Sequence, residues 1–360
     1  MTTVRPTGML NGGMIMDITF FQVTWFVLWA ILWAAYFMLD GFVLGVGMLH
    51  YRLGKTDSEK RVLLNTVGPV WDGNEVWLLT AGGATFAAFP TTYALMFSYL
   101  YTALFLLLCA LIIRGVSFEF RGKLDSEQWR KSWDLAVFSG SFLPALLFGV
   151  AFGNIFAGLP MDGAGYQGSF FSLLNPYGLL TGFLFVMLFA VHGALYASVK
   201  TTDELKARAQ KTAAGLWPVL LIVAVAFLAG TAFATKLYDN FLTAPTLLIA
   251  PAIAVAALIG IRIFIAQDRL YRAFASSCVT VVMVVFTGVI GLFPNLIPSS
   301  LDPKYSLTIF NSSSSLLTLK IMTGVALIFV PIVIAYKIWI YRIFRVPISV
   351  EEVLKSKEAY

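Results

Sequence analysis

The chain has 360 residues, of which 59% are hydrophobic and only 12% are charged. A soluble globular enzyme is excluded, because a water-soluble domain of this length could not hide so much apolar surface. The formal net charge of +6 would suit nucleic-acid binding in a soluble protein. In a membrane protein it reflects basic cytoplasmic loops, and we expect no nucleic-acid partner.

Long apolar runs predict an all-α polytopic membrane protein with about nine transmembrane helices. A helix needs ~20 apolar residues to cross the hydrocarbon layer, and helices pair their backbone groups internally, as lipid requires. The second span is the least apolar, because polar residues interrupt it. The predicted spans, in chain order, are 18–49, 62–89, 91–119, 133–157, 176–199, 214–237, 244–266, 271–293 and 316–343.

The basic residues predict the orientation of these spans. Nineteen of the 25 lysines and arginines fall in alternate loops, which follow the odd-numbered spans. Since basic residues concentrate on the cytoplasmic side, the N-terminus is expected outside and the C-terminus in the cytoplasm. The expected organisation is an extracytoplasmic tail (1–17), one transmembrane domain (18–345) and a cytoplasmic tail (346–360). The alternation requires the second span, which favours nine spans over eight.

Ionisable residues inside spans are the candidate functional groups, because charge in lipid is costly and is seldom kept without a role. Asp40 lies in the first span, and Arg114 lies near the cytoplasmic end of the third. Asp72 and Glu75 lie three residues apart in the second span, hence toward one helical face. With a rise of ~1.5 Å per residue, these groups fall in the cytoplasmic half. They could form a hydrated proton path from the cytoplasm.

Neighbouring side chains complete the predicted polar network. Trp71 and Asn74 adjoin the acids of the second span, and Pro69 just before them should kink or loosen the helix. His192 lies in the fifth span at a similar depth.

A purely structural reading stands beside the proton path. Asp40 or Asp72 could form a buried ion pair with Arg114, which would not exclude a proton role. His192 is more often a buried, hydrogen-bonded histidine than a ligand. The sequence alone leaves these alternatives open.

Candidate metal ligands are few. A protein that binds several haems needs several axial His, Met or Cys ligands, but the chain has only two histidines, His50 and His192. Cys109 and Cys278 lie inside apolar runs without metal or disulfide spacing. We therefore expect no metal site here, and any redox centre of a complex should lie in another subunit.

Two segments carry a family resemblance. Residues 40–47 (DGFVLGVG) and 68–78 (GPVWDGNEVWL) resemble the first- and second-helix signatures of subunit II of cytochrome bd-type quinol oxidases. Weaker matches follow in the expected order at 114–121, 152–154, 192–194 and 306–320. The resemblance extends from about residue 20 to 345, and the second-helix motif is its most specific part.

The resemblance implies a fold, a partner and a reaction. The fold would be two four-helix bundles plus one peripheral helix, in a bacterial or archaeal cytoplasmic membrane. A larger subunit I would carry haem b and haem d, and the complex would oxidise quinol and reduce dioxygen to water. Subunit II alone would not be catalytic and would bind no haem, although some members hold a structural quinone. Whether a small single-helix accessory subunit is present stays open.

The resemblance also assigns residues. Asp72 matches the aspartate that the family uses for proton uptake from the cytoplasm, with Glu75 and Asp40 as further acids. Trp71, Asn74, Arg114 and His192 would support them. Val43 stands where many members have a second aspartate, so the role of that acid does not carry over.

Two other functions compete with this reading. Midspan acids would also suit a secondary transporter with a proton or ion site, but transporters usually break helices at corresponding positions of two halves. Here the polar cluster is confined to the first three spans. The chain could also be a scaffold for the haem subunit, surrounded by membrane lipid.

Overall fold

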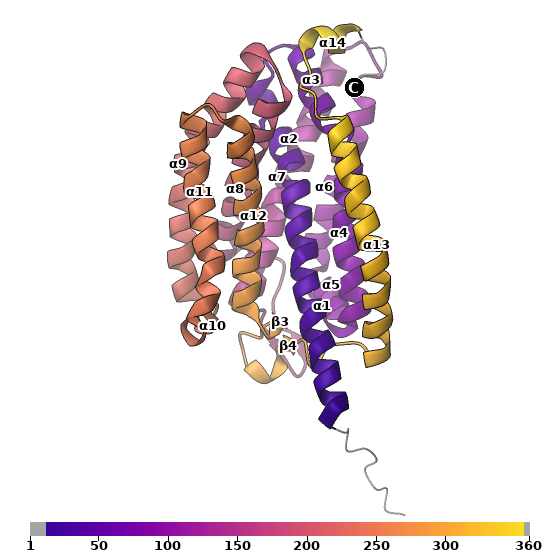
Figure 1. Ribbon diagram of the computed structural model, residues 1–360, viewed down its shortest axis with the longest axis vertical. Coiled ribbons are helices and arrows are strands. Elements are labelled where there is room, and N and C mark those ends of the chain that lie inside the picture. The colour runs from indigo at the N-terminus through magenta and orange to yellow at the C-terminus, as the bar shows by residue number, and fades with distance from the viewer. Residues whose placement is uncertain (1–11, 356–360) are drawn as a thin grey trace, which may run out of the picture.

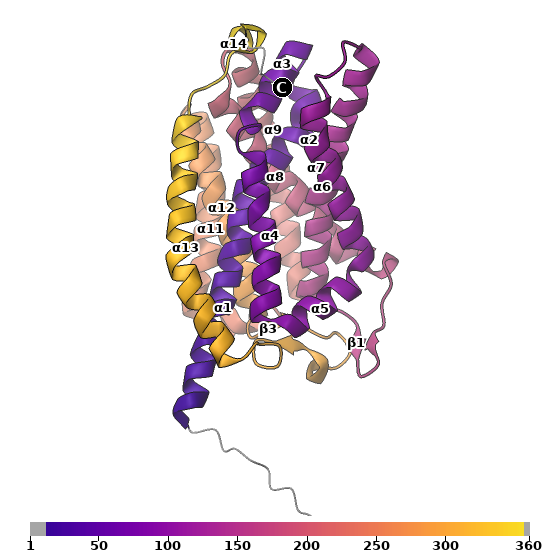
Figure 2. The same ribbon diagram turned by 90° about the vertical axis from the view of Figure 1, so that its right-hand side faces the viewer.

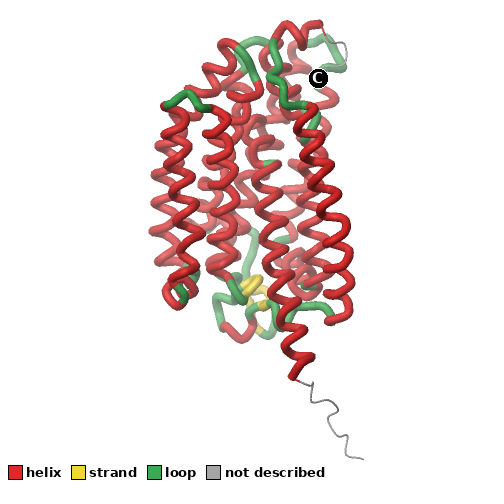
Figure 3. Tube along the Cα trace, viewed as in Figure 1, coloured by secondary structure: helices red, strands yellow, loops and turns green. Residues whose placement is uncertain are grey.

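The computed structural model describes residues 12–355, which form long helices with two small antiparallel β-hairpins (Figures 1 and 3). The helices are α1 (Gly12–Leu39), α2 (Gly41–Leu53), α3 (Asp57–Val67), α4 (Trp71–Ala88), α5 (Pro90–Tyr99), α6 (Tyr101–Phe120), α7 (Glu127–Ala157), α8 (Pro176–Lys200), α9 (Asp203–Ala234), α10 (Tyr238–Thr243), α11 (Ile249–Ala266), α12 (Leu270–Leu292), α13 (Leu316–Ile343) and α14 (Val350–Lys355). The hairpins pair β1 (Met161–Asp162) with β2 (Gly165–Tyr166), and β3 (Asn295–Ile297) with β4 (Leu307–Thr308).

Within the described residues, eight helical segments are long and apolar enough to cross a membrane, and α1 and α2 together count as one of them. The one expected span that is not among these eight is the second, which corresponds to α4. This helix has 18 residues and does not reach the same apolar character, because Asp72, Asn74, Glu75 and three glycines lie in it. It nevertheless runs alongside α1, as Figure 2 shows.

The helices form two bundles of four and one peripheral helix, as expected. The first bundle contains the α1–α2 segment, α4, α6 and α7, and the second contains α8, α9, α11 and α12. The two bundles join where α2 packs between α7 and α8, and where α1 packs on α12. Helix α13 touches α1 and α4, and Leu319 is its one buried residue. It is therefore the peripheral helix.

The two ends of the molecule differ. One end carries α3, α14 and the turns between α6 and α7, between α8 and α9, and between α11 and α12; most basic residues lie there, and we call it the basic end. The β-strands lie at the opposite end (Figure 1).

Part of the expected C-terminal tail is docked on the bundle. The N–H of Ile348 donates to the carbonyl of Lys200 at 2.9 Å, and Val353 of α14 is buried against α3. Of the expected N-terminal tail, residues 1–11 lie outside the described part of the chain, and α1 begins at Gly12.

Two predicted spans are each divided into two helices. The predicted span 62–89 is divided into α3 and α4 by a turn at 68–70, because Pro69 has no N–H to continue the helical hydrogen bonds. The predicted span 91–119 consists of α5 and α6, which meet at Leu100. The kink predicted at Pro69 is therefore a complete break between two helices, whereas apolar residues continue through Leu100 and gave no signal of the second break.

Candidate functional site

A buried ion pair connects the first and third predicted spans. Asp40 lies between α1 and α2, and Arg114 lies on α6; both side chains are fully buried. Arg114 Nη2 donates to Asp40 Oδ2 at 3.1 Å and to Oδ1 at 3.3 Å. Of the two ion pairs that the sequence left open, the structure contains the one with Asp40.

Glu75 of α4 completes the cluster. Arg114 Nη2 also forms an ion pair with Glu75 Oε1, and the Glu75 side chain is 24% exposed. We call Asp40, Glu75 and Arg114 the ion triad. Two carboxylates and one guanidinium carry one net negative charge, which a single proton would neutralise. The triad can therefore hold a proton while Arg114 keeps the two acids together.

Asp72 does not join the triad. Its side chain is exposed on α4, and its Oδ1 accepts a hydrogen bond from the N–H of the following Gly73 at 2.5 Å. Among the described residues, no ion pair joins Asp72 to Arg114, so the alternative pairing is wrong. Asp72 stands in the first turn of α4 and faces outward from this chain, one helical turn nearer the basic end than Glu75.

Trp71 and Asn74, which adjoin the acids of α4, contact three other helices. Trp71 packs against α6, with its ring 5.3 Å from that of Phe118. Asn74 is buried; its Nδ2 donates to the carbonyl of Leu39 at 2.8 Å, and its Oδ1 accepts from the hydroxyl of Tyr341 at 3.0 Å. The motif around Asp72 therefore fixes α4 against α1, α6 and α13.

His192 is buried and both of its ring nitrogens are hydrogen bonded, as the structural alternative in the sequence analysis predicted. Its Nδ1 lies 2.7 Å from Ser277 Oγ, and its Nε2 lies 2.9 Å from the carbonyl oxygen of Met38. The ring stacks on Phe274 at 5.0 Å. His192 thus joins α8 to α1 and α12 and makes no contact with the triad.

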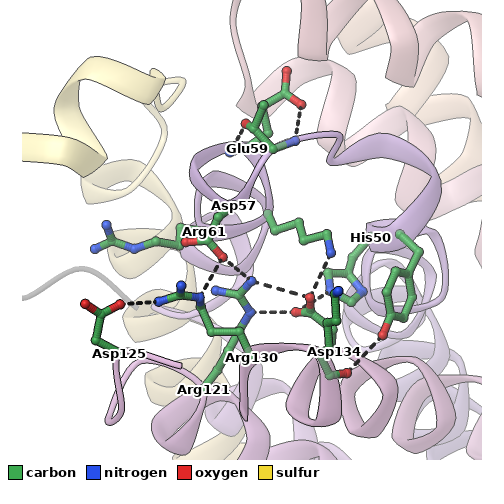
Figure 4. Close-up of polar contacts among 12 residues, drawn as sticks. His50, Asp57, Glu59, Arg61, Arg121, Asp125, Arg130 and Asp134 are labelled. Atoms are coloured by element: carbon green, nitrogen blue, oxygen red, sulfur yellow. Dashed lines mark hydrogen bonds and ion pairs between the residues drawn. The ribbon is translucent and has the colours of Figure 1, made fainter. Parts of the chain in front are cut away.

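A second ionic cluster at the basic end was not predicted (Figure 4). Asp134 of α7 is buried and accepts from His50 Nε2 at 2.9 Å, from Lys60 Nζ at 2.8 Å and from Arg121 Nε at 2.5 Å. Arg121 Nη2 also contacts Asp57 at 2.7 Å. The sequence placed these cations in loops. The one signal was Asp134 itself, an acid at the start of an apolar run.

Among the described residues, no group of three His, Cys, Asp or Glu side chains is placed to hold a metal ion. Cys109 and Cys278 are unpaired.

Comparison with known proteins gives concordant matches along the chain. Residues 21–344 match the family model described as cytochrome bd terminal oxidase subunit II. The probable cytochrome oxidase subunit 2 of Haemophilus influenzae is 39% identical, and the match covers 91% of this chain and 95% of that protein. The cytochrome bd-I ubiquinol oxidase subunit 2 of Escherichia coli K12 is 37% identical over the same shares of the two chains.

Two further matches agree. The cytochrome bd ubiquinol oxidase subunit 2 of Bacillus subtilis is 39% identical, over 91% of this chain and 97% of that protein. A chain in the structure of the bd oxidase from Geobacillus thermodenitrificans shares the fold with a TM-score of 0.75; the match covers 90% of this chain and 98% of that chain at 16% identity. The chain belongs to the family of cytochrome bd terminal oxidase subunit II.

Proposed function

We propose that this chain is subunit II of a bd-type quinol oxidase in a bacterial cytoplasmic membrane. Its partner is a larger subunit I, and the complex oxidises quinol and reduces dioxygen to water. Membership of the family, over nearly the whole chain, is the observation that carries this proposal. The finer assignments below rest on the arrangement of the acids.

The haems of the complex, of b and d type, belong to the partner in this proposal. A bound haem supplies the redox centre at which dioxygen is reduced. The two histidines of this chain do not suit an axial haem ligand: both ring nitrogens of His192 are hydrogen bonded, and the fully buried ring of His50 is held by Asp134 through Nε2. The role of this chain is therefore to deliver protons and to hold the partner.

The basic end faces the cytoplasm in this proposal, because basic residues concentrate on that side of a membrane protein. Protons for water formation would enter there. Asp72 lies on the half of α4 nearer the basic end, and its carboxylate is exposed on a membrane helix without an ion pair among the described residues. Lys337 interacts with this carboxylate electrostatically but forms no ion pair with it. An exposed carboxylate on a membrane helix is costly, which favours a position on a hydrated path or against the partner.

The triad lies next on this path. Glu75 is one helical turn beyond Asp72 and is partly exposed, whereas Asp40 is fully buried. We assign Asp72 as the entry acid and Glu75 as the next proton acceptor. Asp40 serves as the fixed counter-charge that keeps Arg114 beside Glu75. Trp71 and Asn74 position this part of α4 through the contacts described above.

A secondary transporter fits the fold less well. The helical breaks around the acids, at Asp40 and at 68–70, both lie in the first bundle. In the second bundle, α8 and α12 run unbroken through the corresponding region of the described chain. The inverted pairs of broken helices typical of transporters are not matched by this arrangement.

The variant Asp72→Asn tests the proposal. Asparagine keeps the shape and hydrogen bonding of the side chain but cannot ionise, so the complex should assemble with normal haem content and lose most of its quinol oxidase activity. Oxygen consumption per haem is the measurement. Asp268→Asn is the matched control, because Asp268 lies in the turn between α11 and α12 at the same end of the other bundle.

The control should retain full activity. Full turnover of Asp72→Asn at normal haem content would rule out an obligatory proton role for this acid. Loss of haem from the complex would instead make Asp72 a brace for the subunit interface.

A further inference from the structure

Helix α13 is attached to the first bundle at two separated places. Near the β-strand end, Trp25 Nε1 donates to the carbonyl of Leu319 at 3.2 Å and to Thr323 Oγ1 at 3.0 Å. Near the basic end, the hydroxyl of Tyr341 donates to Asn74 at 3.0 Å. Between these attachments α13 stands away from the bundle, on the outside of the molecule (Figures 1 and 2).

The space between the two attachments is a groove of about 1080 Å³ bounded by α1, α4 and α13. Its walls are almost entirely apolar and include Leu28, Leu32, Trp77, Val325 and Phe329. Thr323 and Tyr341 are 18 positions apart, which is roughly 27 Å along the helix and close to the ~30 Å of a bilayer's hydrocarbon layer. The groove therefore runs along the membrane normal and suits hydrocarbon chains.

Positive charge gathers at one end of the groove. Lys337, Arg342 and Arg345 all line it near the basic end. Lys337 and Tyr341 are four residues apart on one face of α13, and Arg345 lies in the turn just after the helix ends at Ile343. None of the three cations forms an ion pair with another described residue.

The described residues of this chain do not balance the local charge. The ammonium of Lys337 lies over the start of α4, where a Cβ on Gly73 would be 2.5 Å from Nζ, and it interacts electrostatically with Asp72. Three cations against this one carboxylate leave a surplus of two positive charges at the mouth of an apolar groove. Such a site suits a ligand that has a negatively charged head group and hydrocarbon chains.

We propose that the groove binds an anionic phospholipid, with its acyl chains along α1, α4 and α13 and its phosphate among Lys337, Arg342 and Arg345. Guanidinium groups bind phosphate oxygens in paired hydrogen bonds, and the ammonium adds a point charge. An uncharged quinone or an apolar helix of the partner would fill the groove but would leave the three cations uncompensated. The charge complementarity therefore favours the phospholipid.

Lipid binding to the intact two-subunit complex tests this proposal. The complex is delipidated in mild detergent, and phosphatidylglycerol or phosphatidylcholine with the same acyl chains is added. Native mass spectrometry then counts the lipids bound per complex. We expect one tightly held phosphatidylglycerol. The double variant Lys337→Gln/Arg345→Gln should weaken its binding by about 30-fold, since each basic residue contributes about fivefold.

Two controls separate head-group binding from general effects. Arg262→Gln/Arg272→Gln makes the same charge change at the basic end of the second bundle, outside the groove, and should leave lipid binding unchanged. Ala326→Trp fills the groove without changing charge and should displace both lipids.

Three results would overturn the proposal. They are equal binding of phosphatidylglycerol and phosphatidylcholine to the unmodified complex, unchanged phosphatidylglycerol binding in Lys337→Gln/Arg345→Gln, and extraction of quinone rather than phospholipid from the groove. Because the readout is bound lipid, it is independent of whether the complex oxidises quinol.

Discussion

A step of three residues along α4 gives Asp72 and Glu75 different surroundings. Residues three apart on an α-helix differ in direction by about 60°. This angle is enough for Glu75 to reach Arg114 on α6 while Asp72 points away from the bundle. The same segment therefore supplies one acid with a fixed counter-charge and one acid that is free to meet water or the partner.

Arg114 should be essential for assembly, because it is the shared partner of two carboxylates. Arg114→Met would leave the fully buried Asp40 uncompensated, at a cost of about 3–5 kcal/mol. We expect a strong fall in the yield of the haem-containing complex and in its thermal unfolding midpoint. The double variant Asp40→Asn/Arg114→Met, which removes both charges, should recover much of the loss. A single Arg114→Met variant as stable as the unmodified complex would contradict the triad.

The sequence predicted the members of this site better than their contacts. Ionisable residues in apolar runs were sufficient to select Asp40, Asp72, Glu75 and Arg114. The choice between two possible partners for Arg114 depends on helix rotation, which a spacing of three residues leaves undetermined. The cluster around Asp134 was missed because its cations come from segments that read as loops.

At the scale of helices, glycine allows a close crossing of α2 and α8. A Cβ on Gly45 of α2 would lie 1.9 Å from the carbonyl oxygen of Phe189 and 2.8 Å from the Cα of Gly193 on α8. Only hydrogen fits between these backbones. This close contact between α2 and α8 joins the two bundles.

Gly45→Ala should separate α2 from α8. Because the obstacle is backbone rather than a movable side chain, we expect destabilisation by about 1–3 kcal/mol, the usual cost of overpacking. Thermal unfolding of the purified complex measures it. Gly82→Ala on α4 is the matched control, since nothing lies within 4 Å of its added Cβ. Equal unfolding midpoints for the two variants would contradict the close crossing.

A surface ion pair attaches α3 to α9. Arg208 forms an ion pair with Glu59, which also caps α3 by accepting from the backbone N–H groups of Lys55 and Thr56. Burial raises the pKa of Glu59, but the hydrogen bonds from Arg208 and these N–H groups outweigh it and hold the pKa below its ordinary value. The stabilisation is therefore present above the ordinary pKa and is lost as the pH falls through the lowered one.

Glu59→Gln should consequently lower the stability of the folded protein at neutral pH but not in acid. We expect its unfolding midpoint to fall below that of the unmodified complex at pH 7, by an amount that corresponds to at most about 1 kcal/mol. The difference should shrink as the pH falls through the acid range. Melting curves of both proteins across this range measure it, and a difference that grows in acid would refute the assignment.

Span boundaries were predictable where apolar character and helix ends coincide. The range of α13 matches its predicted span at both ends, and α8 differs by one residue. Helix α9 begins at Asp203, eleven residues before its predicted span, because a polar first part that packs at the basic end carries no apolar signal. The break at 68–70 falls at Pro69, where a kink was predicted, whereas the break at Leu100 was missed because apolar residues continue through it.

At the scale of the molecule, the chain presents long apolar faces and short soluble segments. Helices α4, α6 and α13 each expose large apolar side chains, such as Leu79, Ile112 and Leu327. The connections between helices are short by comparison. The partner subunit is therefore expected to bind helix faces within the membrane rather than the loops.

The most direct test of the account is purification of this chain, carrying an affinity tag, from its native membrane in mild detergent. We predict a complex with a larger subunit that shows b- and d-type haem absorbance and consumes oxygen with quinol. The same chain produced without the partner should carry no haem. A colourless protein purified alone from the native membrane, or stoichiometric haem on the isolated chain, would contradict the account.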